Sequence, residues 1–241
     1  ASCLVGSEMC IRDRSMMDHA SKEAQYEIHV LHTNISEEMQ KKMHAMENAN
    51  FSVQFDHVTE YLHSIQEKLP LRDYYSITTY FRLFIAEMFP EIDKAIYIDS
   101  DTVVLGDIAQ LYAYDLGDAY VGACKEQVMI QEEVYGTYVE KVLGVERDNY
   151  FNAGMLVINC EQFRKNHVLE QFMELLPMYN FVVTQDEDYL NLICHNKVCW
   201  LPQKWNVEVF GQIPCREEEI CVLHYICLLY TSPSPRDKRQ S

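Results

Sequence analysis

Short apolar runs alternate along this chain with segments whose apolar residues recur at helical spacing, and this alternation is the feature that most constrains the fold. The predicted strands are residues 26–32, 51–58, 94–99, 120–124, 153–159 and, as the last of them, 197–202. The predicted helices are residues 76–89, 161–166, 168–179 and 186–195, with a further helix that begins after Ser36. Strands interleaved with helices predict an α/β fold: an open, mixed, mainly parallel sheet with helices on both faces.

The two ends of the chain look foreign to this pattern. Residues 5–14, VGSEMCIRDR, and residues 227–236, CLLYTSPSPR, match one DNA string read on opposite strands, and that string resembles a sequencing-library adapter. We therefore expect residues 1–15 and 227–241 to be non-native sequence from cloning or assembly. Residues 16–226 are then expected to form a single domain that is truncated at both ends.

The charge balance disfavours one class of partner. The chain contains 20 Lys and Arg against 37 Asp and Glu, which gives a formal net charge of −17. Such a chain repels nucleic acid and anionic lipid. A neutral partner, or an anionic partner bridged by a metal ion, is expected instead.

Two carboxylates, one residue apart, follow the apolar run IYI. Asp99 and Asp101 flank Ser100 in the stretch IYIDSDTVV, residues 96–104. A buried carboxylate without a partner is costly, so we expect both at the rim of the sheet, where α/β sheets bind their ligands. A short loop can turn two carboxylates toward one hard cation such as Mn²⁺ or Mg²⁺, which then bridges to phosphate oxygens.

The same stretch allows two other interpretations. Aspartates in loops commonly cap turns. The segment DSDTV also fits a phosphatase pattern, Asp-x-Asp-x-Thr/Val, in which Asp99 would be a nucleophile and Asp101 a general acid. That class of enzyme carries the motif close to the start of its domain, whereas here it lies well inside the chain.

Two further segments place polar groups beside a strand and at a helix start. In YFNAGMLVIN, residues 150–159, Asn152, Ala153 and Gly154 lead into an apolar strand, and their small size allows a ligand to approach the backbone. In TQDEDYLN, residues 184–191, three acids begin a helix. Plainer interpretations are a turn before a strand, and acids that interact favourably with the helix dipole.

Taken in order, these segments resemble glycosyltransferase family 8. The matching motifs are TTYFRLFIAEMFP, DKAIYIDSDTVVLGDIAQLY, YFNAGMLVINCEQFRK, QDEDYLN, LPQKWN and VLHY, spread over residues 25–225. The resemblance implies a GT-A (Rossmann-like) fold. It also implies a retaining, metal-dependent enzyme that moves a hexose, glucose or galactose, from a UDP-sugar to a glycan, lipid-linked or protein acceptor.

The resemblance further implies roles for individual residues. The implied ligands of Mn²⁺, with Mg²⁺ as the alternative, are Asp99, Asp101 and His224. The implied donor-binding residues are Arg82, Asp99, Ser100, Asp101, Asn152, Ala153, Gly154 and Asp186. The implied catalytic residues are Asp186 and Glu187. Without the resemblance, Arg82 reads as a charge on a helix surface and His224 as a surface or core histidine.

Glu187 departs from the family pattern, because many members carry Gln beneath the reactive carbon of the sugar. Gln is a poor nucleophile, and a same-face internal return is the usual proposal for such members. Glu can instead attack and form a covalent glycosyl-enzyme, or stabilise an oxocarbenium-like transition state. The sequence leaves these mechanisms open.

The resemblance also implies segments that this chain lacks. The family begins with a strand and an Asp-containing segment that holds uracil, whereas residues 15–20 resemble the end of the helix that follows. We therefore expect that the first strand is missing, that a sheet edge is exposed and that this chain is poorly active.

Two other functions and the location of the protein complete the expectations. A non-catalytic nucleotide-sugar-binding module is the second function that we consider, and a phosphohydrolase is the third. We expect a cytoplasmic protein, with a peripheral position at the inner face of the membrane as the alternative, because some members attach there through a basic C-terminal tail.

Overall fold

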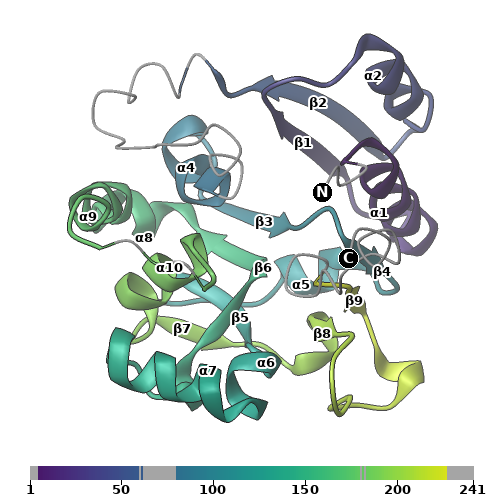
Figure 1. The fold of residues 1–241 in the computed structure, drawn as a ribbon. Helices are drawn as coiled ribbons and strands as arrows, with labels where there is room; N and C mark the ends of the chain where they lie inside the picture. Colours follow the sequence, from purple (N-terminus) through teal and green to yellow (C-terminus); the bar gives the residue numbers. More distant parts are fainter. Residues whose placement is uncertain (1–4, 60, 62–79, 180, 182, 227–241) are drawn as a thin grey trace, which may run out of the picture.

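The computed structural model describes residues 5–59, 61, 80–179, 181 and 183–226 (Figure 1). The strands are β1 (Tyr26–His32), β2 (Phe51–His57), β3 (Lys94–Ile98), β4 (Thr102–Val104), β5 (Val121–Lys125), β6 (Phe151–Asn159), β7 (Val198–Trp200), β8 (Val207–Glu208) and β9 (Val222–His224). The α-helices are α1 (Val5–His19), α2 (Glu37–His44), α4 (Phe81–Met88), α5 (Ile108–Tyr112), α6 (Gln127–Gln131), α7 (Glu133–Tyr138), α8 (Cys160–Lys165), α9 (Val168–Leu175) and α10 (Asp186–Cys194). Shorter helical turns are η3 (Val139–Leu143, a π-helix), η4 (Arg147–Asn149), η5 (Gln203–Trp205) and η6 (Glu217–Glu219).

The described strands form three sheets. The largest has the order β3-β6-β5-β7, the second is the pair β1-β2, and the third has the order β4-β9-β8. Three pairings are parallel (β1·β2, β5·β7 and β8·β9) and three are antiparallel (β3·β6, β5·β6 and β4·β9). The mixed α/β architecture is therefore confirmed, but the sheet is not mainly parallel, because the long central strand β6 runs against both of its neighbours.

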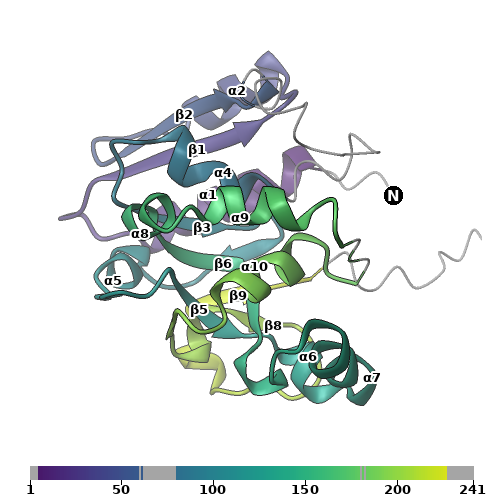
Figure 2. The same cartoon turned by 90° about the vertical axis from the view of Figure 1, so that its left-hand side faces the viewer.

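Strand β6 is buried because elements pack on both faces of its sheet. Leu156 and Ile158 belong to a core cluster shared with α4, α8, α9 and α10. Met155 and Val157 belong to a second cluster, which includes side chains of α1 and α5 and the ring of Trp205. Successive side chains of a strand point to opposite faces, so the near-continuous apolar run of β6 fits a strand that is covered twice. Helices on both faces are thus confirmed, and Figure 2 shows them on either side of β6.

Most of the predicted segments form the expected elements. Residues 76–79 of one predicted helix lie outside the described residues, and the described helix α4 ends at Met88, just before Pro90, whose missing N–H disfavours a longer helix. The expectation that residues 197–202 form the last strand is wrong, because β8 and β9 follow. Strands β4, β8 and β9 have only two or three residues each, which is too short to show a period in the sequence.

Helix α1 runs across the boundary predicted between residues 15 and 16. Nη1 of Arg12 donates to the Ile98 carbonyl at 3.1 Å, and Oγ of Ser15 accepts the Val104 N–H at 2.9 Å. Helix α1 therefore packs beside the turn that joins β3 to β4. That residues 1–15 are non-native sequence stays a prediction.

Six of the described strands have a single strand partner: β1, β2, β3, β4, β7 and β8. Strand β1 pairs with β2, and β3 pairs with β6. Each of these strands therefore leaves one edge without a strand neighbour in the described part of the chain. The missing first strand itself stays a prediction.

Candidate functional site

Asp99 and Asp101 lie in the tight turn between β3 and β4. The Asp99 N–H donates to the Gly154 carbonyl at 2.7 Å, and Oγ1 of Thr102 donates to the Asp99 carbonyl at 2.9 Å. Ser100 is half-buried at the tip of the turn. The two carboxylate side chains keep 25% and 16% of their surface exposed, so a ligand can reach both. The turn thus holds them beyond the carboxyl end of β3, as predicted.

His224 reaches this turn from the other end of the described chain. Strand β9 pairs with β4 so that His224 lies opposite Thr102. Nε2 of His224 is 3.4 Å from Oδ1 of Asp101 and 4.0 Å from Oδ2 of Asp99. Burial lowers the pKa of His224, but the hydrogen bond with Asp101 and the charges of both carboxylates outweigh it, so the pKa lies above its usual value.

Gly154 of β6 lets the His224 imidazole and the Asp99 carboxylate pack closely against the backbone. A Cβ atom at this position would lie 2.7 Å from Oδ2 of Asp99 and 3.0 Å from Nε2 of His224, and still closer to Cε1 of that ring. Any side chain here would therefore collide with the His224 ring and the Asp99 carboxylate. The glycine is needed here for the close approach that its missing Cβ allows.

The three side chains fit a divalent cation. One ligand atom from each of Asp99, Asp101 and His224 lies within 4.8 Å of the other two. Carboxylate oxygens suit Mn²⁺ and Mg²⁺, and the imidazole nitrogen adds a ligand that transition metals bind well. Two of these three groups, Asp99 and His224, pack against the backbone at Gly154, so the missing Cβ of the glycine helps to bring the donor set together.

Arg82 of α4 is buried among acidic groups. Its Nη2 lies 3.2 Å from Oδ1 of Asp99, its Nε lies 2.9 Å from Oδ2 of Asp186, and its Nη1 donates to the Ala153 carbonyl. The guanidinium also lies over the ring of Tyr97, 4.5 Å from its centre. Burial by itself lowers the pKa of Arg82, but the charges of Asp186 and Asp99 outweigh it and raise the pKa above its usual value. Arg82 is therefore not the surface charge that an isolated helix suggests.

Two acids at the start of α10, Asp186 and Glu187, have raised pKa values. Burial raises the pKa of Asp186 to about 7, although the charge of Arg82 opposes this shift. Oε2 of Glu187 accepts the Ala153 N–H at 2.7 Å. Burial and the neighbouring charge of Glu126 nevertheless raise the pKa of Glu187 well above its usual range. This environment favours the protonated form of the Glu187 carboxyl.

The third acid of this segment, Asp188, has a structural role. Its Oδ1 accepts from the hydroxyl of Tyr150 and its Oδ2 from the hydroxyl of Tyr138, both at 2.8 Å. Gln185, the residue directly before α10, has a φ of 51°, which is a strained backbone conformation for a residue with a side chain. Asp188 thus anchors the start of α10 to its neighbours.

Asn152 lies at the centre of a hydrogen-bond network. Its Oδ1 accepts the Gly154 N–H at 2.8 Å and Nδ2 of Asn206 at 2.7 Å, and its Nδ2 donates to Oε2 of Glu126. Asn206 in turn accepts from Nδ1 of His224 at 3.1 Å. The network therefore joins the Asn-Ala-Gly segment to the histidine of the proposed cation site.

Sequence reasoning missed three residues of this neighbourhood: Asn206, Glu126 and Glu208. Oε1 of Glu208 accepts the Gln127 N–H at 3.1 Å, and burial with the charge of Glu126 raises the pKa of Glu208 well above its usual range. Asn206 ends the motif LPQKWN, which is a signal for its importance but not for its partners. Glu208 lies on β8, a strand that the sequence pattern did not reveal.

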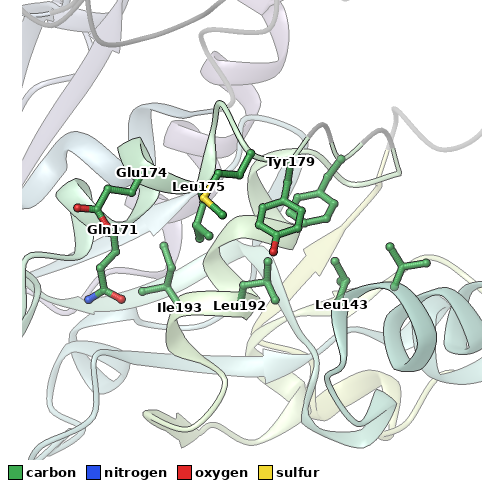
Figure 3. Close-up of a pocket in the computed structure, with 10 residues that line it drawn as sticks. Leu143, Gln171, Glu174, Leu175, Tyr179, Leu192 and Ile193 are labelled. Atoms are coloured by element: carbon green, nitrogen blue, oxygen red, sulfur yellow. The ribbon is translucent and has the colours of Figure 1, made fainter.

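A separate pocket of 360 Å³, half open to solvent, lies between α9, α10 and η3 (Figure 3). Its lining residues are Val142, Leu143, Gln171, Glu174, Leu175, Met178, Tyr179, Phe181, Leu192 and Ile193. This lining shares no residue with the site around Asp99, so the two are separate features of the described structure.

Over residues 5–59, 61, 80–179, 181 and 183–226, we find no helix with the length and apolar character that crossing a membrane requires.

Sequence comparison places the chain among known proteins. The family model described as "Glycosyl transferase family 8" matches residues 10–228. A putative glycosyltransferase of Haemophilus influenzae is 35% identical over 136 residues, which cover 56% of this chain and 40% of that protein. The lipopolysaccharide 1,2-glucosyltransferase of Escherichia coli K12 is 27% identical over 141 residues, which cover 57% and 40%. The chain thus spans less than half of the length of these curated relatives.

Solved structures share the fold. The apo structure of the bifunctional glycosyltransferase WbbM superposes with a TM-score of 0.79 at 26% identity, over 92% of this chain and 44% of that one. A glutamine-to-glutamate active-site mutant of LgtC superposes with a TM-score of 0.72 at 26% identity, over 92% and 84% of the two chains. The GT-A-like α/β fold is therefore confirmed.

Proposed function

This chain belongs to glycosyltransferase family 8, and we propose on that premise that it transfers a hexose from a UDP-sugar, UDP-glucose or UDP-galactose, with the help of a divalent cation. One observation carries this proposal: ligand atoms of Asp99, Asp101 and His224 lie within 4.8 Å of one another, and two of the three side chains pack closely against Gly154. The glucosyltransferase named among the relatives supports the choice of a hexose as the transferred group.

We assign the binding of Mn²⁺, with Mg²⁺ as the alternative, to Asp99, Asp101 and His224. When bound, a divalent cation supplies charge neutralisation for a diphosphate leaving group. Arg82 positions two of the acids, since it contacts both Asp99 and Asp186. Because these contacts preorganise the carboxylates, the site spends little free energy on rearrangement when it binds the donor.

We assign recognition of the donor sugar to the Asn152–Gly154 segment, to Ser100 and to Asp186. Glu187 lies against the backbone of this segment, where Oε2 accepts the Ala153 N–H. Its raised pKa favours a protonated carboxyl, which is a poor nucleophile, as a carboxamide is. This supports a same-face retaining mechanism, in which Glu187 stabilises the transition state, over a covalent intermediate on Glu187.

The contacts of Asp99 make the phosphohydrolase the weaker candidate. Oδ1 of Asp99 accepts from the Tyr97 hydroxyl at 2.5 Å and lies 3.2 Å from Arg82, while Oδ2 faces His224. Groups that hold a carboxylate by hydrogen bonds lower its reactivity as a nucleophile. The same contacts suit a carboxylate that is fixed as a ligand.

The acceptor and the location of the enzyme are part of the proposal. We propose a glycan, lipid-linked or protein acceptor and a cytoplasmic location, peripheral at the membrane where a membrane-bound acceptor requires it. Six cysteines whose side chains the structure describes are free thiols, as suits a reducing compartment: Cys124, Cys160, Cys194, Cys199, Cys215 and Cys221.

The test is UDP release from UDP-glucose and UDP-galactose, with and without Mn²⁺, together with calorimetric binding of UDP. The Asp101→Ala variant is compared with Asp118→Ala, which changes an exposed aspartate. We expect Mn²⁺-dependent release of UDP from one donor, lost in Asp101→Ala and kept in Asp118→Ala. Binding of UDP without release from either donor, with or without simple sugar acceptors, would make the chain a binding module instead.

A further inference from the structure

Asn206 is buried between two functional groups of the site. It is fully inaccessible to solvent and follows the turn η5. Its Nδ2 donates to Oδ1 of Asn152 at 2.7 Å, and its Oδ1 accepts from Nδ1 of His224 at 3.1 Å. One amide therefore touches both the Asn-Ala-Gly segment and the histidine of the proposed cation site.

The orientation of this amide follows from a backbone donor. The Gly154 N–H can only donate, so the atom of Asn152 that it contacts at 2.8 Å must be the oxygen Oδ1. That same oxygen faces Asn206, so Asn206 must present its NH₂ group to Asn152. Its carbonyl oxygen is then left for His224.

An oxygen beside Nδ1 of His224 determines where this imidazole keeps its proton. A carbonyl oxygen cannot donate, so it stabilises a proton on Nδ1 and repels a lone pair there. Asp101 and Asp99 lie on the side of Nε2 and favour a proton on that nitrogen. A cation that binds Nε2 displaces this second proton, and the imidazole must then keep its proton on Nδ1.

We propose that Asn206 is a positioning residue that fixes the Nδ1–H form of His224, presents Nε2 to a divalent cation, and ties that cation site to the sugar-binding Asn152. This inference rests on the proposed function, because it assumes a cation at Asp99, Asp101 and His224. It adds a residue outside the ligand set. It also gives a physical route by which donor sugar and cation affect each other, since Asn152 and His224 are held by the same amide.

Two substitutions of Asn206 separate its acceptor from its donor. Asn206→Leu keeps the approximate shape and removes both hydrogen bonds. Asn206→Asp keeps an acceptor for Nδ1 of His224 and removes the donor to Asn152. Asn196→Ala is the matched control, because Asn196 also contacts a histidine, His195, but lies exposed at the surface.

The primary readout is the binding of Mn²⁺ alone, measured by the loss of the electron paramagnetic resonance signal of the free ion. We expect Asn206→Leu to weaken Mn²⁺ binding by about 10–100-fold, the usual effect of removing a partner of a metal-binding histidine. Asn206→Asp is expected to bind Mn²⁺ within about threefold of the unchanged protein, because a carboxylate is at least as good an acceptor. Asn196→Ala should have no effect.

The second readout is the affinity for UDP-glucose and UDP-galactose relative to UDP, at saturating Mn²⁺. Asn206→Asp should bind UDP normally and lose affinity for the preferred UDP-sugar, because Asn152 has lost its partner. Circular dichroism and thermal melting establish that each variant is folded. A merely structural role would lower the melting temperature of both variants and weaken Mn²⁺ binding in both.

The outcomes distinguish this inference from the proposed function. If Asp101→Ala loses Mn²⁺ binding but folded Asn206→Leu keeps it, the cation site stands and the role of Asn206 is overturned. The role is also overturned if folded Asn206→Asp binds Mn²⁺ as weakly as Asn206→Leu does. If the unchanged protein and Asp101→Ala bind Mn²⁺ equally weakly, both the cation site and the inference drawn from it fail.

Discussion

Arg82 and Asp186 form a buried ion pair, with Nε of the guanidinium 2.9 Å from Oδ2 of the carboxylate. This pair joins α4 to the start of α10, two helices that the chain forms far apart in sequence. Both side chains are less than one-tenth exposed. A buried pair of this kind contributes little net stability while it is intact, but removing one partner leaves an uncompensated charge.

Replacing Arg82 should therefore destabilise the fold strongly. We expect Arg82→Leu to lower the free energy of unfolding by about 3 kcal/mol, because Asp186 and Asp99 lose their buried cation. Urea denaturation measures this change. Arg147→Leu is the control, since Arg147 pairs with Glu133 and Glu140 at the surface. An equal loss in the two variants would contradict the prediction.

The stability of the protein should depend on pH through Asp186. Its pKa is about 7 in the folded protein and near 3.8 in an unfolded chain. Between these values the folded state binds more protons than the unfolded state, so the free energy of unfolding falls as pH rises from about 4 to about 7. The raised pKa values of Glu187 and Glu208 act in the same direction.

Urea denaturation between pH 4.5 and 8 tests this dependence. Other carboxylates titrate in both proteins, so the comparison with Asp186→Asn isolates the contribution of one group. As the pH rises, the free energy of unfolding of the unchanged protein should fall relative to that of Asp186→Asn. Parallel curves over the whole range would show that Asp186 titrates normally.

We expect Gly154→Ala to disrupt the proposed cation site without unfolding the protein. The new Cβ would lie 2.7 Å from Oδ2 of Asp99 and would push against the His224 ring. We expect Mn²⁺ binding to weaken by at least about tenfold, comparable to the loss of a residue that orients a ligand. Gly136→Ala is a fair control, because the atoms that its Cβ meets belong to the end of the Arg147 side chain at the surface. Normal Mn²⁺ binding by Gly154→Ala would place the ion elsewhere.

Glu187→Gln should keep most of the transferase activity. A protonated carboxyl and a carboxamide have similar size, and either can accept the Ala153 N–H. We expect UDP release from the preferred donor within about tenfold of the unchanged protein, whereas removal of an attacking nucleophile costs about 10⁴-fold or more. Retention of the anomeric configuration, followed by NMR, completes the test. An inactive but folded Glu187→Gln would favour a covalent glycosyl-enzyme.

The local features of this protein could be predicted from its sequence. The apolar run that ends at Asp99 predicts a strand with carboxylates at its carboxyl end. The closeness of Asp99 and Asp101 follows from the chain itself, because they lie one residue apart. The helical spacing of residues 81–88 likewise predicts α4. Neither conclusion needs knowledge of a distant partner.

The contacts between distant segments could not be predicted in this way. His224 could be identified as a site residue only through its motif, because a three-residue strand such as β9 shows no period in the sequence. The partners of Asn206 depend on the packing of η5 against β6, which no local pattern records. The burial of Arg82 was also hidden, because a single charged residue on an amphipathic helix is usually exposed.

The pairing of β9 with β4 has a consequence for how the site is made. In the observed register His224 lies opposite Thr102, and side chains alternate between the two faces of a strand. A slip of one residue would present Leu223 or Tyr225 to the two aspartates and turn the imidazole away. Strand β9 is also the last described strand to be synthesised, so a nascent chain holds Asp99 and Asp101 without their histidine until that strand arrives in register. The proposed cation site is therefore complete only once β9 has paired with β4, and that pairing also completes the third sheet.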